Sequence, residues 1–319
     1  MWELSKDTGI EEKEMRIIFR EALEELMREN SKILAFEADL GGASSFSKIK
    51  DSYPDNFVQM GISEANMVGT AASTSMRGFI PYIHTFSPFA SRRVGDQVFL
   101  TGAYAKNTLN IYGSDPGICA AANGGTHTSF EDIAFYRAIP GAVVLDPADG
   151  VQLDWVVKEV SKLKGVHYIR ANRKAVSRVY KEGSKFEIGK GNIVKDGKDV
   201  LLITMGFLVR EALDAAKELE KDGISVEVID MFTIKPLDKE LIKSQIEGKK
   251  LVVTFENHSI INGLGSAVAE VMAENGSGIK LKRLGVEEKF GQVGSFDFLK
   301  EEYGLTKRRV KDVIIELVG

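Results

Sequence analysis

The chain has 319 residues, which is enough for about two domains that each bury a core. Hydrophobic residues at 44% and charged residues at 28% are typical of globular proteins, and no stretch approaches the roughly 20 apolar residues of a membrane-spanning helix. The 42 Lys and Arg against 46 Asp and Glu argue against general nucleic-acid binding, and the single cysteine excludes an intrachain disulfide. We expect a cytoplasmic protein, because the first residues are too charged for a signal peptide.

The first half of the chain alternates helix-like and strand-like segments. Residues 11–30 carry apolar side chains at helical spacing, and residues 32–40 have the composition of a buried strand. Further helix-like segments are predicted at 64–76 and 151–163. The remaining strands are predicted at 56–60, 80–84, 109–112, 142–145 and 167–169. This alternation is typical of a parallel, doubly wound sheet.

A second alternating series follows a segment of different composition. Residues 181–198 are rich in Lys, Gly, Glu and Asp, so we place a domain boundary near Ser184, with domains 1–184 and 185–319. Strands are then predicted at 200–204, 225–230, 250–255 and 279–284, and helices at 209–222, 238–246, 265–274 and 306–317. The predicted fold is therefore α/β, with two domains that are each a mainly parallel doubly wound sheet flanked by helices.

Glu64 lies in the segment QMGISEANMVGTAAS, which is otherwise small or apolar. A carboxyl group there is expected to be desolvated, which raises its pKa and suits a group that shares a proton with a ring nitrogen. The alternative is that Glu64 is an acidic residue at a helix N-terminus, where it interacts with the helix dipole.

Two glycine-rich segments are candidates for ligand binding. His127 lies in GICAAANGGTHTSFED, where small side chains leave room for a ligand to meet the backbone and the imidazole. The segment 263–270, GLGSAVAE, begins like a dinucleotide-binding turn but lacks the third glycine, so its glycines are expected to allow close packing instead. No Cys/His cluster or phosphate loop is present, and we expect no metal site formed by this chain alone.

Several segments, taken in their order, resemble the C-terminal half of transketolase. These segments are GISEANMVG, PYIHTFSPFASRR, GGTHTSFEDIAFYRAIPG, YIRANR and FENHSIINGLG. The resemblance covers nearly the whole chain and identifies a pyrimidine-binding domain followed by a transketolase C-terminal domain. The Gly-Asp-Gly element with which this family binds the cofactor diphosphate and its metal is not present in the sequence.

The resemblance therefore implies a split transketolase, whose separate N-terminal subunit supplies the diphosphate-binding domain. Thiamine diphosphate would lie between the chains, and Mg²⁺ or Ca²⁺ would be bound mainly by the partner. The implied assembly is an α2β2 heterotetramer.

The resemblance also implies roles at the cofactor. Glu64 matches the glutamate that hydrogen-bonds the pyrimidine N1′ and helps to generate the nucleophilic carbon of the cofactor. Phe86 and Phe89 match the aromatic residues that flank the pyrimidine, although both could be ordinary core residues. Asp39 matches an acidic residue near the cofactor, and Arg92 replaces a third aromatic residue of the family.

Arg173 matches the arginine that holds the sugar phosphate, with Arg16 and Ser44 as companions. Guanidinium groups bind phosphate oxygens in a bidentate manner. Arg170 is the rival for this role, and because strand neighbours alternate faces we expect just one of the two arginines to face the site.

His127 matches the histidine that contacts sugar oxygens, where a donor stabilises developing charge. Two segments depart from the family pattern. Ser114 and Asp115 occupy the region of a family His-Asp pair, and we assign Ser114 to the cofactor site. Asn123 stands where many relatives have an aspartate that recognises the donor 2-hydroxyl group.

The leading hypothesis is a subunit that transfers a two-carbon glycolaldehyde unit from a ketose phosphate to an aldose phosphate. The first alternative is the β-type subunit of another thiamine diphosphate enzyme, a 2-oxo acid dehydrogenase or a deoxyxylulose-phosphate synthase-like protein. A second alternative is a non-catalytic paralogue. A third is a nicotinamide oxidoreductase, which would bind its cofactor without a partner.

Overall fold

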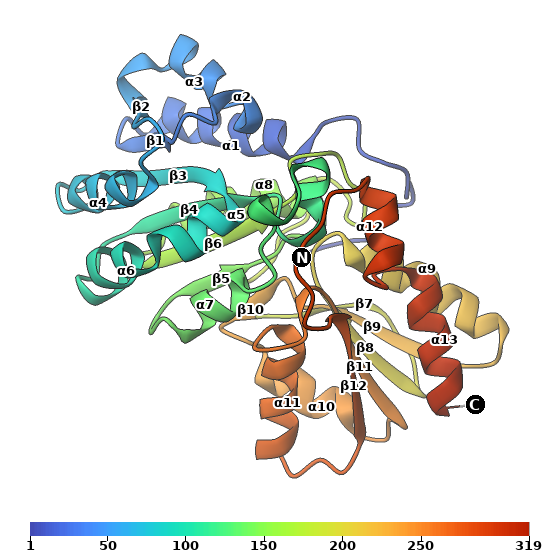
Figure 1. The fold of residues 1–319 in the computed structure, drawn as a ribbon. Helices are drawn as coiled ribbons and strands as arrows, with labels where there is room; N and C mark the ends of the chain where they lie inside the picture. The colour runs from blue at the N-terminus through green and yellow to red at the C-terminus, as the bar shows by residue number, and fades with distance from the viewer. Residues whose placement is uncertain (319) are drawn as a thin grey trace.

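Two mainly parallel β-sheets, one for each half of the sequence, organise the chain, and helices cover both faces of each sheet (Figure 1). The computed structural model describes residues 1–318. The α-helices are α1 (Met15–Glu29), α2 (Gly41–Ser44), α3 (Ser47–Ser52), α4 (Glu64–Ser75), α5 (Ser87–Ser91), α6 (Gly95–Gln97), α7 (Asp132–Ala138), α8 (Gly150–Val160), α9 (Leu208–Lys221), α10 (Lys239–Ile246), α11 (Leu264–Glu274), α12 (Phe296–Glu302) and α13 (Lys307–Val318). The strands are β1 (Ile33–Glu37), β2 (Phe57–Gln59), β3 (Ile80–Phe86), β4 (Leu109–Ser114), β5 (Val143–Leu145), β6 (Val166–Ala171), β7 (Asn192–Lys195), β8 (Val200–Thr204), β9 (Val226–Asp230), β10 (Thr233–Lys235), β11 (Leu251–Ser259) and β12 (Lys280–Val286).

Shorter helical turns connect these elements. A π-helix, η3, spans Val98–Tyr104, and the 3₁₀ segments are η1 (Pro54–Asn56), η2 (Arg92–Val94), η4 (Gly117–Asn123) and η5 (Gly125–His127). The last two form the glycine-rich segment that carries His127.

The first sheet has the strand order β10-β5-β6-β4-β3-β1-β2. All neighbours in it are parallel except β10, which pairs antiparallel with β5. Successive side chains of β1 point to opposite faces of this sheet. Ala35 packs in a hydrophobic cluster with residues of α1 and α8, and Phe36 packs in a second cluster with residues of α4. The continuous apolar runs of the sequence are thus strands covered on both sides.

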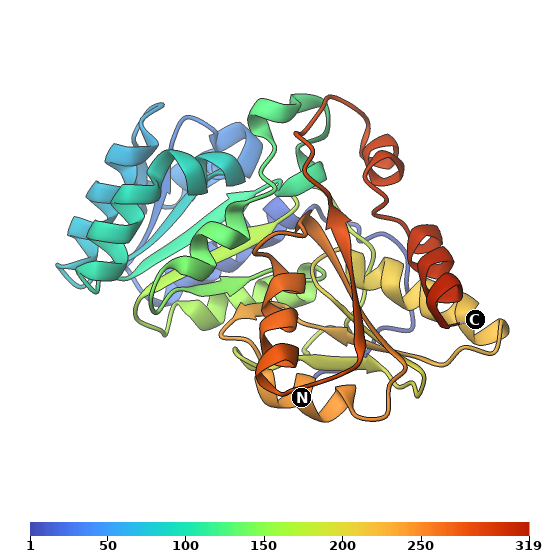
Figure 2. The ribbon, with the colours of Figure 1, turned by 60° about the horizontal axis from the view of Figure 1, so that its bottom comes forward.

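The second sheet has the order β12-β11-β8-β9-β7, parallel except for β7 against β9. Figure 2 shows α11, in orange, and α13, in red, on opposite sides of this sheet. The predicted fold class is confirmed for both halves.

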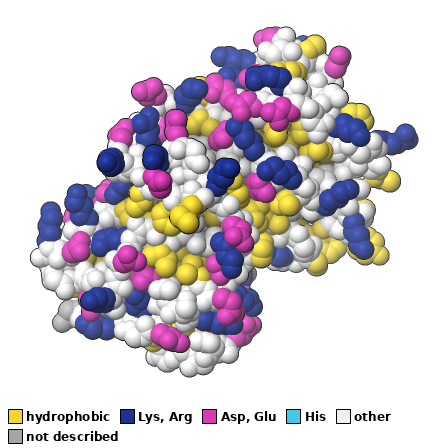
Figure 3. Space-filling view, turned by 180° about the vertical axis from the view of Figure 1, so that it is seen from behind, with side chains coloured by type: hydrophobic (Ala, Val, Ile, Leu, Met, Phe, Trp, Pro, Cys, Tyr) yellow, Lys and Arg dark blue, Asp and Glu magenta, His cyan; other side chains and the backbone are white. Residues whose placement is uncertain are grey.

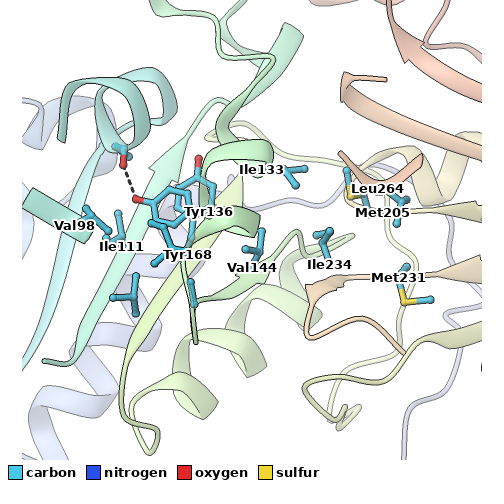
Figure 4. Close-up of a cluster of buried hydrophobic side chains, with 14 of the residues drawn as sticks. Val98, Ile111, Ile133, Tyr136, Val144, Tyr168, Met205, Met231, Ile234 and Leu264 are labelled. Carbon is cyan, nitrogen blue, oxygen red and sulfur yellow. Dashed lines mark hydrogen bonds between the residues drawn. The ribbon is translucent and has the colours of Figure 1, made fainter. Parts of the chain in front are cut away.

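A shared hydrophobic cluster joins the two halves (Figure 4). Tyr136 and Tyr168 of the first half stack with ring centroids 4.0 Å apart, and Met205, Met231 and Leu264 of the second half belong to the same cluster. Strand β10 reinforces this junction, since it comes from the second half and completes the edge of the first sheet. Its three residues are too few for a periodic pattern, which is why the sequence did not reveal it.

A buried carboxylate also links the halves. Asp230, at the end of β9, accepts hydrogen bonds from Gln152 of α8 at 2.9 Å, from the Tyr180 hydroxyl at 2.5 Å and from Asn192 of β7 at 3.4 Å. Burial raises the pKa of Asp230 and the three hydrogen bonds lower it. Burial has the larger effect, so the pKa is about 7.

We therefore expect Asp230→Asn to change the pH dependence of stability. Between about pH 4 and pH 7 folded Asp230 holds a proton that the unfolded chain has lost, so the wild-type free energy of unfolding falls as pH rises through this window. The variant lacks this titration and should gain about 2 kcal/mol relative to wild type between pH 5 and pH 8. Urea unfolding at the two pH values measures the change, and parallel pH profiles would contradict it.

The surface carries charges of both signs. On the face in Figure 3, basic and acidic side chains are interspersed between hydrophobic patches, with no broad field of one sign. None of the helices formed by residues 1–318 has the length and apolar character needed to cross a membrane.

Candidate active site

The carboxyl ends of the parallel strands β1, β3, β4 and β6 meet at one edge of the first sheet. Phe86 ends β3 and pairs in register with Ser114, which ends β4. Glu37 ends β1 and pairs in register with His84 of β3. Ligands of open α/β sheets bind beyond this edge, so polar and aromatic groups there are candidates for a site.

Three rings from separate elements gather beyond β3. The Phe86 ring centroid lies 6.2 Å from that of Phe89 on α5 and 5.6 Å from that of His127 on η5, and the Phe89 and His127 rings are 5.3 Å apart. Phe86 is buried, whereas Phe89 and His127 are half-buried. The Thr126 hydroxyl lies 2.9 Å from Nδ1 of His127 and orients its ring. The His127 ring meets both phenylalanine rings edge-to-face, and such contacts hold the rings in fixed positions.

Glu64 is the first residue of α4 and is 4% exposed, as its apolar surroundings predicted. Arg93 donates from Nη1 to its Oε1 at 2.5 Å. The same guanidinium lies over the Phe89 ring, with Cζ 3.8 Å from the centroid. Glu64 and Phe89 therefore form a cradle that holds a flat, nitrogen-bearing group by one hydrogen bond and one stacking contact.

Sequence reasoning missed Arg93. The resemblance directed attention to Arg92, which instead pairs with Glu131 at 2.8 Å. Nothing in the dipeptide Arg92-Arg93 indicates which guanidinium turns toward Glu64, because that choice depends on the backbone of η2.

Ser114 and Ser44 lie in a buried polar chain rather than facing the three rings. The His84 imidazole is 2.9 Å from the Ser114 hydroxyl through Nε2 and 3.0 Å from Glu37 through Nδ1. Ser44 donates to the other side of this chain, to Oε2 of Glu37 at 2.6 Å. All four side chains are fully buried. The hydroxyl groups of Ser44 and Ser114 thus bind buried side chains beneath the three rings. This arrangement differs from the prediction, in which Ser114 contacts the cofactor and Ser44 contacts the substrate.

Arg173 follows β6, and its guanidinium lies over the Phe86 ring with Cζ 4.7 Å from the centroid. Asp115 binds it through Nε and also accepts from its backbone N–H at 2.8 Å. The Arg16 backbone N–H donates to the Arg173 carbonyl at 3.2 Å, so the two predicted arginines are neighbours. The Arg16 side chain, however, donates to Glu14 at 2.6 Å and to the carbonyls of Gly42 and Ala43.

Arg170, the rival, is fully buried between the two halves. It donates to Asp132 at 2.9 Å, to Asp146 at 2.5 Å and to the carbonyl of Asn257 at 3.0 Å. Burial raises the pKa of Asp146 to about 6, although Arg170 acts to lower it. Since β6 ends at Ala171, Arg173 lies beyond the strand, and strand alternation does not govern its direction. The structure assigns Arg170 to the domain junction and leaves Arg173 beside the rings.

Asp39 and Asn123 are both exposed. Asp39 follows β1 with a left-handed φ of 61°, and Asn123 ends η4, three residues before Thr126. Within residues 1–318 neither side chain is hydrogen-bonded to another residue, so their roles stay predictions.

The second domain holds the segment that carries His127. Asn257, from β11, accepts from the Ile118 N–H at 3.0 Å and donates to the Pro116 carbonyl at 2.9 Å. Gly117 has a φ of +57°, and a side chain there would collide with Asn257. This close approach sets where η4 begins and therefore where the segment leading to His127 lies.

The dinucleotide-like turn is filled by the protein itself. Glu256 accepts from the N–H groups of Leu264 at 2.6 Å and Gly265 at 2.8 Å, which are the amides that a diphosphate would need. A side chain on Gly263 would meet the same carboxylate. The glycines thus serve close packing, as expected. Across residues 1–318 no three His, Cys, Asp or Glu side chains are grouped as a metal site requires.

Comparison with known proteins gives a consistent result for both halves. The family described as "Transketolase, pyrimidine binding domain" matches residues 11–178, and "Transketolase, C-terminal domain" matches residues 189–310. The chain is 42% identical over 304 residues to the 6-deoxy-6-sulfo-D-fructose transketolase subunit SqwH of Clostridium sp. (strain MSTE9), covering 95% of this chain and 94% of that protein.

Two further matches have similar coverage. A putative transketolase C-terminal section of Methanocaldococcus jannaschii is 40% identical over 306 residues, which cover 95% of this chain and 96% of that protein. A solved structure titled "Split gene transketolase, inactive beta4 tetramer" superposes with a TM-score of 0.87 at 37% identity and covers 96% of this chain and 98% of that one.

Proposed function

Because the chain belongs to the transketolase family, we propose that it is the C-terminal subunit of a split transketolase and works with a separate N-terminal subunit. The reaction is transfer of a two-carbon glycolaldehyde unit from a ketose that carries a terminal acidic group, such as a ketose phosphate, to an aldose phosphate. The observation that carries this proposal is the cradle formed by Glu64 and Phe89 beside the Phe86 and His127 rings.

The cradle fits the pyrimidine half of thiamine diphosphate, the cofactor of this family. The Arg93 guanidinium acts as a stand-in, since it is flat, donates an N–H to Glu64 and stacks on Phe89, as an aminopyrimidine would. Glu64, Phe86 and Phe89 would hold that ring. The diphosphate and its Mg²⁺ or Ca²⁺ would be bound mainly by the N-terminal subunit, as the resemblance to a split transketolase implies. When bound, the cofactor supplies a carbon nucleophile that accepts the two-carbon unit.

The residues of this chain then have distinct tasks. Glu64 holds and exchanges a proton at the pyrimidine N1′, and its burial keeps water from competing. The half-buried His127 donates to a substrate oxygen on which negative charge develops. Arg173 binds the acidic end of the sugar and Asn123 the donor hydroxyl, and the exposed Asp39 lies near the cofactor. The chain of Ser44, Glu37, His84 and Ser114 keeps the floor rigid.

The donor sugar has two candidates. A ketose phosphate follows from the guanidinium group of Arg173. A ketose with a terminal sulfonate is the second candidate, because the 42% identical protein of Clostridium is named for a 6-deoxy-6-sulfo sugar. We propose an α2β2 heterotetramer; the split-gene title of one relative supports a separate partner subunit, and that relative is described as an inactive beta4 tetramer, in which the partner is not named.

Calorimetry with thiamine diphosphate and Mg²⁺ tests the proposal, first on this chain alone and then on its complex with a co-expressed N-terminal subunit. Turnover of xylulose 5-phosphate with ribose 5-phosphate, and of 6-deoxy-6-sulfofructose with an aldose phosphate, is followed in parallel. We expect binding and turnover in the complex alone. Tight binding by the isolated chain, or turnover of 2-oxo acids instead of ketoses, would contradict the proposal, and absence of any binding would favour a non-catalytic paralogue.

Arg93→Ala is expected to tighten cofactor binding by the complex. The guanidinium occupies the cradle and must leave before a ring can enter, which costs its ion pair with Glu64 and its contact with Phe89. Both contacts are partly exposed and together are worth about 1.4 kcal/mol, or about tenfold in Kd. Calorimetry measures Kd. Arg92→Ala, which removes the neighbouring guanidinium and its pair with Glu131, is the control, and equal Kd values for Arg93→Ala and wild type would contradict the expectation.

A further inference from the structure

Asp115 holds Arg173 in one orientation. Its backbone has a φ of 53° and its N–H donates to the Ala171 carbonyl at 3.1 Å, which fixes the aspartate directly after β4. Asp115 is 2% exposed. One carboxylate oxygen accepts from the Arg173 backbone N–H at 2.8 Å and the other binds its Nε. The carboxylate is therefore a fixed part of the arginine's surroundings.

Arg173 keeps its two terminal amino groups for a ligand. Among residues 1–318, no acceptor is hydrogen-bonded to Nη1 or Nη2 of Arg173, and a fifth of its side chain is exposed. The guanidinium lies over Phe86, one of the three rings of the site. Two parallel N–H groups of this kind suit two oxygens of a tetrahedral acid group.

The other cations near this point are neutralised by the protein. Glu14 binds both Arg16, at 2.6 Å, and Lys174, at 2.9 Å, and Arg20 pairs with Glu21 at 3.2 Å. With Asp115 beside Arg173, each of these positive side chains contacts a carboxylate, although Arg16 and Lys174 share Glu14. No cation of this group is left without a carboxylate to reinforce the Arg173 fork.

We propose that Asp115 is a specificity-determining residue that sets the charge of the acid group accepted by Arg173, favouring a singly charged terminus, such as a sulfonate, over a phosphate dianion. This inference rests on the proposed function. Sulfonate and phosphate have the same tetrahedral shape, but a phosphate monoester carries close to two charges above pH 7, because its second pKa is about 6. The additional charge is repelled by Asp115, whereas the fork binds both groups equally well by shape.

The test uses the assembled two-subunit enzyme with 6-deoxy-6-sulfofructose and fructose 6-phosphate as alternative donors at pH 8. Wild type should use the sulfonate with a kcat/KM at least equal to that for the phosphate. Asp115→Asn keeps an oxygen for the Arg173 N–H but removes the charge, and should shift the ratio of the two kcat/KM values toward the phosphate by about tenfold. The shift should appear in KM, because the acid group lies away from the reacting carbon.

Two variants make the result specific. Asp115→Glu retains the charge and should retain the wild-type ratio of kcat/KM values. Asp7→Asn removes a carboxylate that pairs with Arg178 and not with Arg173, so it should also leave this ratio unchanged. The inference would be overturned if wild type preferred the phosphate, or if Asp115→Asn turned over both donors with an unchanged ratio of kcat/KM values. Either result would leave the proposed function standing. No turnover of any ketose by the wild-type complex would overturn the proposed function, and this inference with it.

Discussion

Replacing Glu64 by glutamine is expected to lower kcat of the two-subunit enzyme by about 10²–10⁴-fold, the range for loss of proton transfer by a positioned side chain. The amide has the same shape and can still accept a hydrogen bond, but it cannot exchange a proton with a ring nitrogen. Glu64 is buried at the start of α4, and among residues 1–318 its side chain is hydrogen-bonded to Arg93 alone, so the fold should tolerate the change. Steady-state kinetics gives kcat, and circular dichroism monitors the fold.

The matched control for this variant is Glu270→Gln. Glu270 also pairs with an arginine, Arg137, at 2.8 Å, but it is exposed on α11 of the second domain. Its turnover should equal that of wild type. Near-normal turnover of Glu64→Gln would remove Glu64 from the mechanism, and a similar loss in both variants would indicate a general effect of lost charge.

Replacing Arg170 by methionine is expected to lower the free energy of unfolding by about 3–5 kcal/mol, because it leaves Asp132 and Asp146 as uncompensated buried carboxylates. Burial acts to raise the pKa of Asp132, but Arg170 and His258 hold this pKa below its ordinary value. The Asp132 carboxyl group is therefore charged in the folded protein. Urea unfolding of the full chain followed by fluorescence measures the loss.

Two comparisons separate the buried charge from a general effect of losing arginine. Arg178→Ala removes a surface pair with Asp7 and should change stability by less than about 1 kcal/mol. Adding Asp132→Asn and Asp146→Asn to Arg170→Met removes the stranded charges and should recover part of the loss. Equal stability of Arg170→Met and wild type would mean that the network does not hold the domains together.

The alternating pattern predicted most of the helices and strands of the fold, because both sheets are mainly parallel and covered on both faces. The predicted strand at 200–204 and β8 coincide, and the helix predicted at 64–76 is α4, Glu64–Ser75. The elements that the pattern did not predict are the edge strands β7 and β10 and the short helices α2, α3, α5, α6, α7 and α12. β7 lies in the charged segment near the predicted boundary, with burial that alternates, and β10 crosses to the sheet of the other half.

The candidate site was predictable in part. Family strings placed Phe86, Phe89 and His127, and the structure brings their rings together. Ser44 also belongs to a recognisable string, but the hydroxyl turns inward to Glu37. A sequence motif gives the identity of a residue but not the direction of its side chain. The direction of the Ser44 side chain depends on the backbone of α2 and on the buried acceptor within reach, which is Glu37.

The sequence by itself determined the α/β class, the two halves and the residues near the strand ends, since the spacing of apolar residues records which faces are buried. The tertiary structure alone decided which charges meet. Glu64 and Arg93 are 29 residues apart, and Asp115 and Arg173 are 58 residues apart. Such partners are set by strand order and by the turns that follow each strand, which bring distant segments within the few ångströms over which a carboxylate and a guanidinium hydrogen-bond.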